Sequence, residues 1–399
     1  MLNLNLPLQV RLHYQITTPM FLGGADQKAD GEHFRNASYK GALRFWWRAL
    51  HWGGFLHEAK GNIQSALIAL HKKEGELFGR VSDGRDSCQS RVHIRSRFGA
   101  ANIDLNKELK SVEYLLGQGL YHFREGVLRE YISGGDVGIA LEFLPETAEE
   151  DVTGVVRAAI ALGLFGAMGS RGRRGLGSLS LNKVVYANGQ EESFTALDDI
   201  KRFVASLDFS AGGKPPFTAF CNASRIVVTG QDGNALKALA KVGDEMQLYR
   251  GYGRFVERTG QHEVNGKKAR QNFKPDHDNV LQAARSSSAP RQLPVRSVFG
   301  LPHNYYFSSV NAQMDIAPEG GGRRASPLLI HVHALEKGRF AVIQTLLPAV
   351  FLHEKMAVEA KPGKGASKKI LDTSIEYKVI NQYIDGFKNQ PGFEELRRG

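Results

Sequence analysis

Alternating apolar side chains place four strands in the first half of the chain. In LQVRLHYQI (8–16), every second side chain from Leu8 to Ile16 is apolar, which is typical of a strand with one buried face. DVGIALEFL (136–144) alternates in the same way, and further strands are predicted at 91–98 and 178–186. A chain with this pattern must cover the apolar face of a sheet.

Two helical segments lie between these strands and can provide that cover. SYKGALRFWWRALHW (38–52) repeats its apolar residues with helical period, and TGVVRAAIALGLFGAM (153–168) is apolar on most sides. The resulting order is β-α-β-β-α-β, the ferredoxin-like arrangement with two helices on one face of a four-stranded antiparallel sheet. The other sheet face is then free, and RNA-recognition domains bind RNA on that face.

The second half repeats this order around an insertion. A strand at 223–230 and a helix are followed by a hairpin, in which SPLLIHVHAL and RFAVIQTLL flank EKG, and by a last helix at 374–387. The final strand is weak or missing. The polar stretch 187–216 is interpreted as the linker between the halves, and the stretch 257–296 as an excursion with little core.

We therefore predict an α+β protein with two ferredoxin-like (RRM-like) domains in tandem. The first spans 1–208 and contains a glycine-rich loop. The second spans 209–399, with a basic insertion around 250–300 and a degenerate last strand.

The charge balance favours a polyanionic partner. Lys and Arg number 52 against 41 Asp and Glu, a formal net charge of +11, which suits nucleic acid first and an anionic membrane second. The only cysteines, Cys88 and Cys221, form no disulfide framework, and no signal peptide or bilayer-spanning run is evident. A cytoplasmic protein without a membrane partner is expected.

The loop GSRGRRGLGS (169–178) is the strongest binding signal. Dinucleotide-binding and Walker loops follow a strand and open a helix, whereas this loop follows a helix and opens a strand, which argues against a mononucleotide site. Glycines let a backbone approach phosphodiesters, and arginine forks bind phosphate oxygens, so the loop is interpreted as a grip on a polynucleotide. A solvated basic turn is the alternative. The candidate RNA-binding residues are Ser170, Arg171, Gly172, Arg173, Arg174, Gly175 and Gly177.

The helix KGALRFWWRALH (40–51) offers a second basic surface. Lys40, Arg44 and Arg48 fall on one face, and Trp47 lies at its border. Charge for the backbone beside a ring for stacking is what a polynucleotide groove needs, so this face is predicted to oppose the loop as a second jaw. The alternative is a buried tryptophan beside a merely solvated basic face.

Two weaker motifs lie in the second half. YRGYGRF contributes Arg250, Tyr252 and Arg254 as RNA-binding candidates. GGGRRASPLLIHVH contributes Arg323 and Arg324, and it repeats the design of the first loop: glycines, paired arginines, a small residue and a strand.

Signals for catalysis or a metal are thin. His331 and His333 share a strand face but lack a third ligand at recognisable spacing, and Asp26 and Asp30 suit either Mg²⁺ or loop solubility. No catalytic motif is present. We expect no catalytic residue, no metal and no cofactor.

Four segments together resemble a known family. TPMFLGGADQ, YKGALRFWWRAL, GSRGRRGLGS and RRASPLLIHV resemble the RAMP superfamily of CRISPR effector complexes, and within it the family of first subunits of type III-B Cmr complexes. The resemblance implies two ferredoxin-like domains and a non-catalytic RNA-binding subunit at the head of the complex, near the crRNA 3′ end. It implies crRNA, target RNA and other Cmr subunits as partners, especially the sixth and the backbone subunit, which is the one expected to cleave.

Two other functions remain open at this point. One is a metal-independent endoribonuclease of the same superfamily that processes CRISPR transcripts, with His13, His33 or His51 as the base. The other is a scaffold whose basic surfaces bind acidic protein partners.

Overall fold

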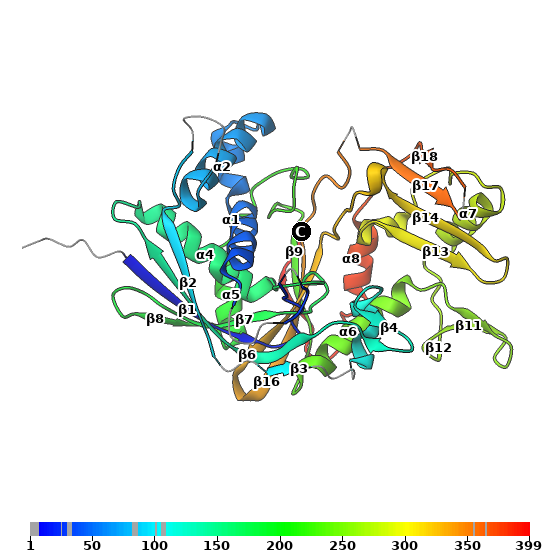
Figure 1. Ribbon diagram of the computed structural model, residues 1–399, viewed down its shortest axis with the longest axis horizontal. Coiled ribbons are helices and arrows are strands. Elements are labelled where there is room, and N and C mark those ends of the chain that lie inside the picture. The colour runs from blue at the N-terminus through cyan, green and yellow to red at the C-terminus, as the bar shows by residue number, and fades with distance from the viewer. Residues whose placement is uncertain are drawn as a thin grey trace, which may run out of the picture. The chain divides into compact units, whose positions relative to one another are not determined.

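The computed structural model describes residues 8–24, 26–29, 34–81, 87–99, 102–104, 109–353, 356–363 and 365–399 (Figure 1). Its contacts define two compact units. Unit 1 comprises Met1–Ala240, Leu329–Leu347 and Gln390–Gly399, and unit 2 comprises Lys241–Leu328 and Pro348–Asn389. The predicted boundary after residue 208 lies inside unit 1, and it remains a prediction about which segments fold independently.

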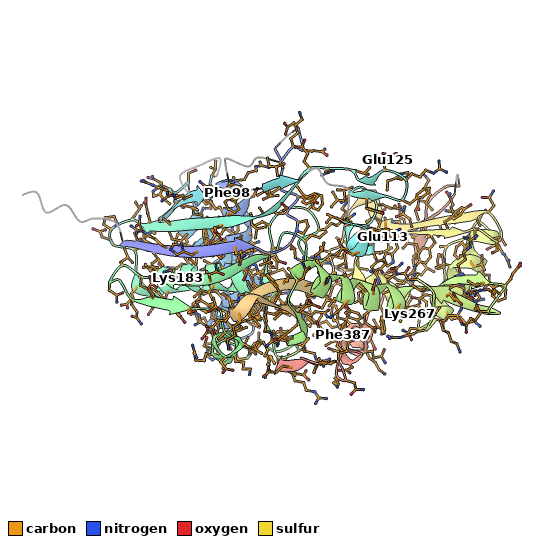
Figure 2. The ribbon with its side chains drawn as sticks, turned by 90° about the horizontal axis from the view of Figure 1, so that it is seen from below. Phe98, Glu113, Glu125, Lys183, Lys267 and Phe387 are labelled. Atoms are coloured by element: carbon orange, nitrogen blue, oxygen red, sulfur yellow. The ribbon has the colours of Figure 1, made fainter. Side chains whose placement is uncertain are left out.

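The first sheet of unit 1 contains the strands predicted for the first half. Its order is β2-β6-β1-β7-β8, with β3 also paired to β6. Pairing of β1 with both β6 and β7 is antiparallel. Phe98 on β2 and Lys183 on β7 lie on either side of the two central strands (Figure 2). The strands are β1 (Leu8–Ile16), β2 (Val92–Phe98), β3 (Asn102–Asp104), β6 (Tyr131–Phe143), β7 (Leu179–Val185) and β8 (Glu191–Ser193).

Two helices cover the apolar face of this sheet, as the periodicity predicts. They are α1 (Asn36–Glu58) and α4 (Glu149–Phe165), which lie side by side in Figure 1. The Tyr14 hydroxyl of β1 is 2.8 Å from the Tyr39 hydroxyl of α1, and it donates to the Ala159 carbonyl of α4 over 2.9 Å. The buried tyrosine pair therefore ties the first strand to both helices.

A second sheet in unit 1 has the order β15-β16-β9-β19. Its strands are β9 (Arg225–Asp232), β15 (Leu328–Leu335), β16 (Arg339–Leu346) and β19 (Glu394–Arg397). The principal strands of each half, numbered along the chain, follow the same spatial order, 2-3-1-4. The last strand of the second half, expected to be weak or missing, is present: β19 is four residues long and pairs with β9 with a register shift between Glu395 and Arg397. Its sequence, EELR, has no apolar alternation to reveal it.

Two further expectations need correction. The polar stretch 187–216 is not an unstructured linker, because it forms β8 and α5 (Leu197–Ala205), and α5 buries Ile200, Phe203 and Val204. The stretch 257–296 contains α7 (Lys274–Arg285), which buries its own apolar side. α5 does repeat its apolar residues with helical spacing, at 197, 200, 203 and 204, but it stands within a polar stretch, whereas α7 has few apolar residues. The remaining elements of unit 1 are α2 (Ile63–Phe78), η1 (Lys110–Val112), α3 (Glu113–Leu116), β4 (Tyr121–His122), β5 (Gly126–Val127) and η4 (Glu336–Gly338).

Unit 2 is built on a four-stranded sheet of order β13-β14-β17-β18 and a three-stranded one of order β10-β11-β12. The helix α6 (Ala235–Arg250) enters it from unit 1. Its other elements are β10 (Arg254–Val256), β11 (Gln261–Val264), β12 (Lys267–Lys268), η2 (Val295–Phe299), β13 (His303–Phe307), β14 (Ala312–Pro318), η3 (Glu319–Gly321), β17 (Val358–Pro362), β18 (Lys368–Ile370) and α8 (Lys378–Asp385).

The two histidines of β15 are packing residues within unit 1. The His331 Nδ1 lies 2.6 Å from the Gly166 carbonyl, and the His333 Nε2 lies 2.7 Å from the Phe194 carbonyl. Both side chains are fully buried. Burial lowers the pKa of His331 to about 3 and that of His333 to about 4, so both imidazoles are neutral at neutral pH.

These pKa values predict acid sensitivity. Both values lie below the ordinary 6.5, so the unfolded chain takes up protons first, and stability falls as the pH drops from about 6.5 towards 3–4. We expect each histidine to cost about 2 kcal/mol of unfolding free energy at about pH 5, measured by urea denaturation. The double variant His331→Gln/His333→Gln should show a shallower decline, and an equal decline would contradict this assignment.

Candidate nucleic-acid interface

The glycine-rich loop 169–178 is held by backbone hydrogen bonds against the segment TPMFLGG (18–24). The Ser170 N–H donates to the Phe21 carbonyl over 3.0 Å, and the Gly177 N–H donates to the Pro19 carbonyl over 2.8 Å. The two glycine-containing segments of the family resemblance are therefore neighbours in space. Their junction is the place at which this fold can form a site.

Close packing explains why several loop positions are glycine. Gly177 has φ +67°, and a Cβ there would lie 2.0 Å from the Met168 carbonyl oxygen. Gly169 has φ +85°, and its Cβ would meet the Phe21 carbonyl oxygen at 2.6 Å. Gly175 is buried against Leu239. Gly172 differs, because a Cβ there would meet Ala167 and the Gly169 carbonyl only at ordinary contact distances of 3.4–3.6 Å, so packing does not require glycine at this position.

Two loop arginines bind the chain itself. The Arg171 guanidinium donates to the Leu116 carbonyl over 3.0 Å and to the Gln118 carbonyl over 2.7 Å. Arg174 donates to the Leu115 carbonyl over 3.3 Å. These carbonyls lie at the end of α3, where unpaired carbonyls have partial negative charge. Arg171 and Arg174 therefore brace the segment 113–118 against the loop.

This bracing yields a stability prediction. Replacing Arg171 and Arg174 together by Ala removes the donors to several carbonyls, and the unfolding free energy should fall by about 2–3 kcal/mol. Thermal denaturation of the purified chain measures the change. The matched variant Arg285→Ala, at an exposed position on α7, should leave the melting temperature unchanged. A double variant as stable as the parent would show that the braces contribute nothing.

The basic face of α1 is turned towards α2. Glu74 of α2 is buried, and its carboxylate accepts from Arg44 Nε over 2.6 Å and from Arg48 Nη1. The two arginine side chains are still about one-third exposed, at 35% and 33%. Lys40 lies 3.4 Å from the Ser90 hydroxyl, and its pKa is lowered by burial and then by Arg44.

The stacking role predicted for Trp47 is not supported. Its side chain is only 2% exposed, and its ring stacks on His51 at a centroid distance of 4.6 Å. The loop reaches a different side of α1, where the Arg173 guanidinium lies over the Phe45 ring at 5.4 Å. Loop and basic face are therefore not opposed jaws. In the sequence, an aromatic residue at the border of a basic helix face has the same pattern whether its ring is exposed for stacking or buried in the core.

A cavity of about 250 Å³ lies where the two glycine segments meet. We call it the glycine-loop cleft. Two arginines that the sequence analysis missed, Arg35 and Arg129, line it together with Ser170. Arg35 also donates to the Gly23 carbonyl. Both arginines stand outside any glycine motif, so only the fold reveals them. The lining comprises Phe21, Leu22, Gly23, Gly24, Gln27, Arg35, Arg129, Glu130, Gly169 and Ser170.

The open face of the first sheet is also basic. Arg95 on β2 and Arg11 on β1 flank Ala140, and Arg97 and His13 flank Gly138 in the next row. These central positions present no ring on which a base could stack, unlike the free face of an RNA-recognition domain. Arg95 is paired to Glu142 over 3.0 Å.

The candidates of the second half lie in different settings. Arg250, Tyr252 and Arg254 line one cavity of unit 2. Arg323 is exposed. The Arg324 guanidinium donates to the Val350 carbonyl and lies over the Phe351 ring at 5.8 Å. Arg324 therefore supports unit 2 itself, like the braces of the first loop.

The residues weighed for catalysis or metal binding are dispersed. Across the described ranges, no three His, Cys, Asp or Glu side chains form a group that could hold a metal ion. Asp26 accepts from the Lys28 N–H, while Asp30 and His33 lie outside the described residues. Burial lowers the pKa of His51. Among the described helices, none is both long and apolar enough to cross a membrane.

Comparison with known proteins bears directly on this site. Residues 13–180, which contain both glycine segments, match the sequence model of the RAMP superfamily, so the resemblance seen in the sequence is confirmed there. The structure is similar to apo Cmr1 from Pyrococcus furiosus, with a TM-score of 0.53 at 19% identity over 98% of this chain and 99% of that one.

A chain in the type III-B Cmr-beta complex bound to cognate target RNA is also similar. It has a TM-score of 0.46 at 12% identity and covers 96% of this chain and 99% of that one. No curated protein matches.

Proposed function

We propose that this chain is a non-catalytic, RNA-binding subunit of a type III-B CRISPR effector complex, built from two ferredoxin-like domains. It contacts crRNA or target RNA near the crRNA 3′ end, with the backbone and sixth subunits as neighbours. The observation that supports this most is the position of the glycine-loop cleft, between the two glycine segments of the matched RAMP region. The shared strand order of the two sheets supports the pair of domains.

The residues of the cleft suit a phosphodiester backbone. Arg35 and Arg129 supply guanidinium forks, Ser170 supplies a hydroxyl, and the exposed Gly169 supplies backbone without a side chain. Arg171 and Arg174 contribute indirectly, because they fix the loop by bonding carbonyls of 115–118. Binding of this type reads backbone rather than sequence, so its affinity depends on salt.

The first test measures RNA affinity of the full chain against salt concentration. Each phosphate contact on a single strand contributes about 0.7 to the slope of log K against log salt. The variant Arg35→Gln/Arg129→Gln should therefore bind single-stranded RNA about tenfold more weakly, with a slope reduced by about 1.4. Fluorescence anisotropy with a labelled oligonucleotide provides both values.

A matched control separates this effect from net charge. Arg285→Gln/Arg398→Gln removes the same charge from exposed positions outside the cleft and should leave the affinity within about twofold. Equal losses of RNA affinity in the two double variants would show that the affinity follows net charge alone, which would contradict the proposal.

The non-catalytic role has its own test. The endoribonuclease alternative predicts cleavage of CRISPR repeat RNA in EDTA, lost when His13 is replaced. His13 is exposed on the open sheet face, where it lines a cavity with Lys183 and Asp136. We expect intact RNA after prolonged incubation with the full chain. Cleavage that depends on His13 would overturn the assignment.

A further inference from the structure

Unit 2 contains a cavity of about 670 Å³, and the function proposed for the glycine-loop cleft does not use the residues that line it. The motif YRGYGRF forms one wall: Arg250 ends α6, Tyr252 lies in the loop that follows, and Arg254 begins β10. Glycines separate them, and a Cβ at Gly253 would lie 2.7 Å from Ala269. The glycines thus let the backbone approach the hairpin β10–β11–β12 while the larger side chains line the cavity.

The charged lining of this cavity is predominantly positive. Three arginines, Arg250, Arg254 and Arg296, face one aspartate, Asp278. The Arg250 guanidinium lies 4.7 Å over the Phe299 ring. A ring face leaves the charge of a guanidinium unneutralised, unlike a carboxylate.

Arg296 is placed in the same way. Its guanidinium lies 4.7 Å over the Tyr305 ring, and the Nε atoms of Arg250 and Arg296 are buried without a hydrogen-bond partner. The carboxylate of buried Asp276 accepts hydrogen bonds from the backbone N–H groups of Val295 and Arg296. Arg250 Nη2 also lies 3.2 Å from His303 Nε2, and Arg296 Nη1 donates to the Arg250 carbonyl over 3.2 Å. Neither partner is a carboxylate, so both guanidinium groups keep positive charge at the cavity for an anion.

The rim of the cavity presents aromatic faces. Phe255 is 54% exposed and Tyr306 is 62% exposed, although large aromatic side chains normally bury most of their surface. Deeper in, Tyr252 stacks on His277 with centroids 3.6 Å apart and planes 3° from parallel. Exposed rings beside three arginines match the two halves of a nucleotide, a flat base and an anionic phosphate.

We propose that this cavity binds one nucleotide of a single-stranded RNA, with its base against Phe255 or Tyr306 and its phosphate towards Arg250, Arg254 and Arg296. The volume lies in the range of small-molecule sites, so one nucleotide fits. A pocket for a free nucleotide would enclose most of its ligand, whereas the two rings here are more than half exposed and suit a strand that continues past the rim. The proposal extends the proposed function by a second RNA contact, in unit 2.

The test uses the full chain and a short single-stranded RNA that contains aminopurine, whose fluorescence is quenched when it stacks. We expect quenching on binding, and we expect Phe255→Ala/Tyr306→Ala to abolish it and to weaken the affinity about tenfold. Because both side chains are exposed, the variant should fold, which circular dichroism confirms. Arg254→Gln should reduce the salt slope by about 0.7, the contribution of one phosphate.

Two controls isolate the rings. Tyr306→Phe retains the aromatic face and should keep both quenching and affinity. Leu371→Ala removes an exposed apolar side chain of unit 2 outside the cavity and should change neither. Loss of quenching in Leu371→Ala, or full quenching in Phe255→Ala/Tyr306→Ala, would overturn the proposal.

Two further comparisons are needed. The first decides whether the nucleotide belongs to an RNA strand or is free, and the second distinguishes failure of the unit 2 site from failure of the glycine-loop cleft. Adenosine monophosphate should not displace the RNA at micromolar concentration. Displacement that depends on Phe255 and Tyr306 would show that the ligand of the cavity is a free nucleotide and would overturn the proposal of an RNA strand. The variant Arg35→Gln/Arg129→Gln should still quench aminopurine at saturating RNA. If Arg35→Gln/Arg129→Gln keeps both the quenching and the parent salt slope, RNA binding in the glycine-loop cleft is refuted and the unit 2 site stands. If Arg35→Gln/Arg129→Gln lowers the salt slope and Phe255→Ala/Tyr306→Ala still quenches, the unit 2 site is refuted and the cleft stands.

Discussion

The glycine-rich loop depends on being clamped from two sides by backbone hydrogen bonds. The Gly177 N–H donates to Pro19 in the segment before α1, and the Ile330 N–H of β15 donates to the Arg173 carbonyl over 3.1 Å. The Ser178 hydroxyl accepts from the Val332 N–H over 3.0 Å. The loop therefore joins the first sheet to β15 of the second, and the cleft beside it exists because these bonds hold the backbone in one conformation.

This clamp changes how a basic motif should be understood. An arginine in a glycine-rich loop is assigned to phosphate by its chemistry, but the same five donors satisfy carbonyls at the end of a short helix equally well. Arg171 and Arg174 do the latter, and Arg44 and Arg48 bond a buried glutamate. The positive charges at the cleft come from Arg35 and Arg129, which lie there beside Glu130, so bracing and binding are divided between different arginines.

The sequence predicted the sheets better than the site. Alternation over 8–16 and 136–144 defined β1 and β6, because a half-buried strand leaves a period of two. The four residues of β19 bury too little apolar surface to leave a period, whereas the helical period of α5 stands within a polar stretch that is typical of a linker. The cleft could not be predicted, since Arg35 and Arg129 are 94 residues apart and only tertiary structure brings them to one cavity. Trp47 shows the opposite error, because sequence does not distinguish a ring at a helix border from one in the core.

The central claim is that RNA lies in the glycine-loop cleft rather than on the basic face of α1. Ultraviolet crosslinking of thiouridine-substituted RNA to the full chain, mapped by mass spectrometry, tests it most directly. If RNA lies in the cleft, the crosslinked peptides will contain Arg35, Arg129 or Ser170. Crosslinks confined to the α1–α2 surface around Arg44, Arg48 and Glu74, with none at the cleft, would contradict it.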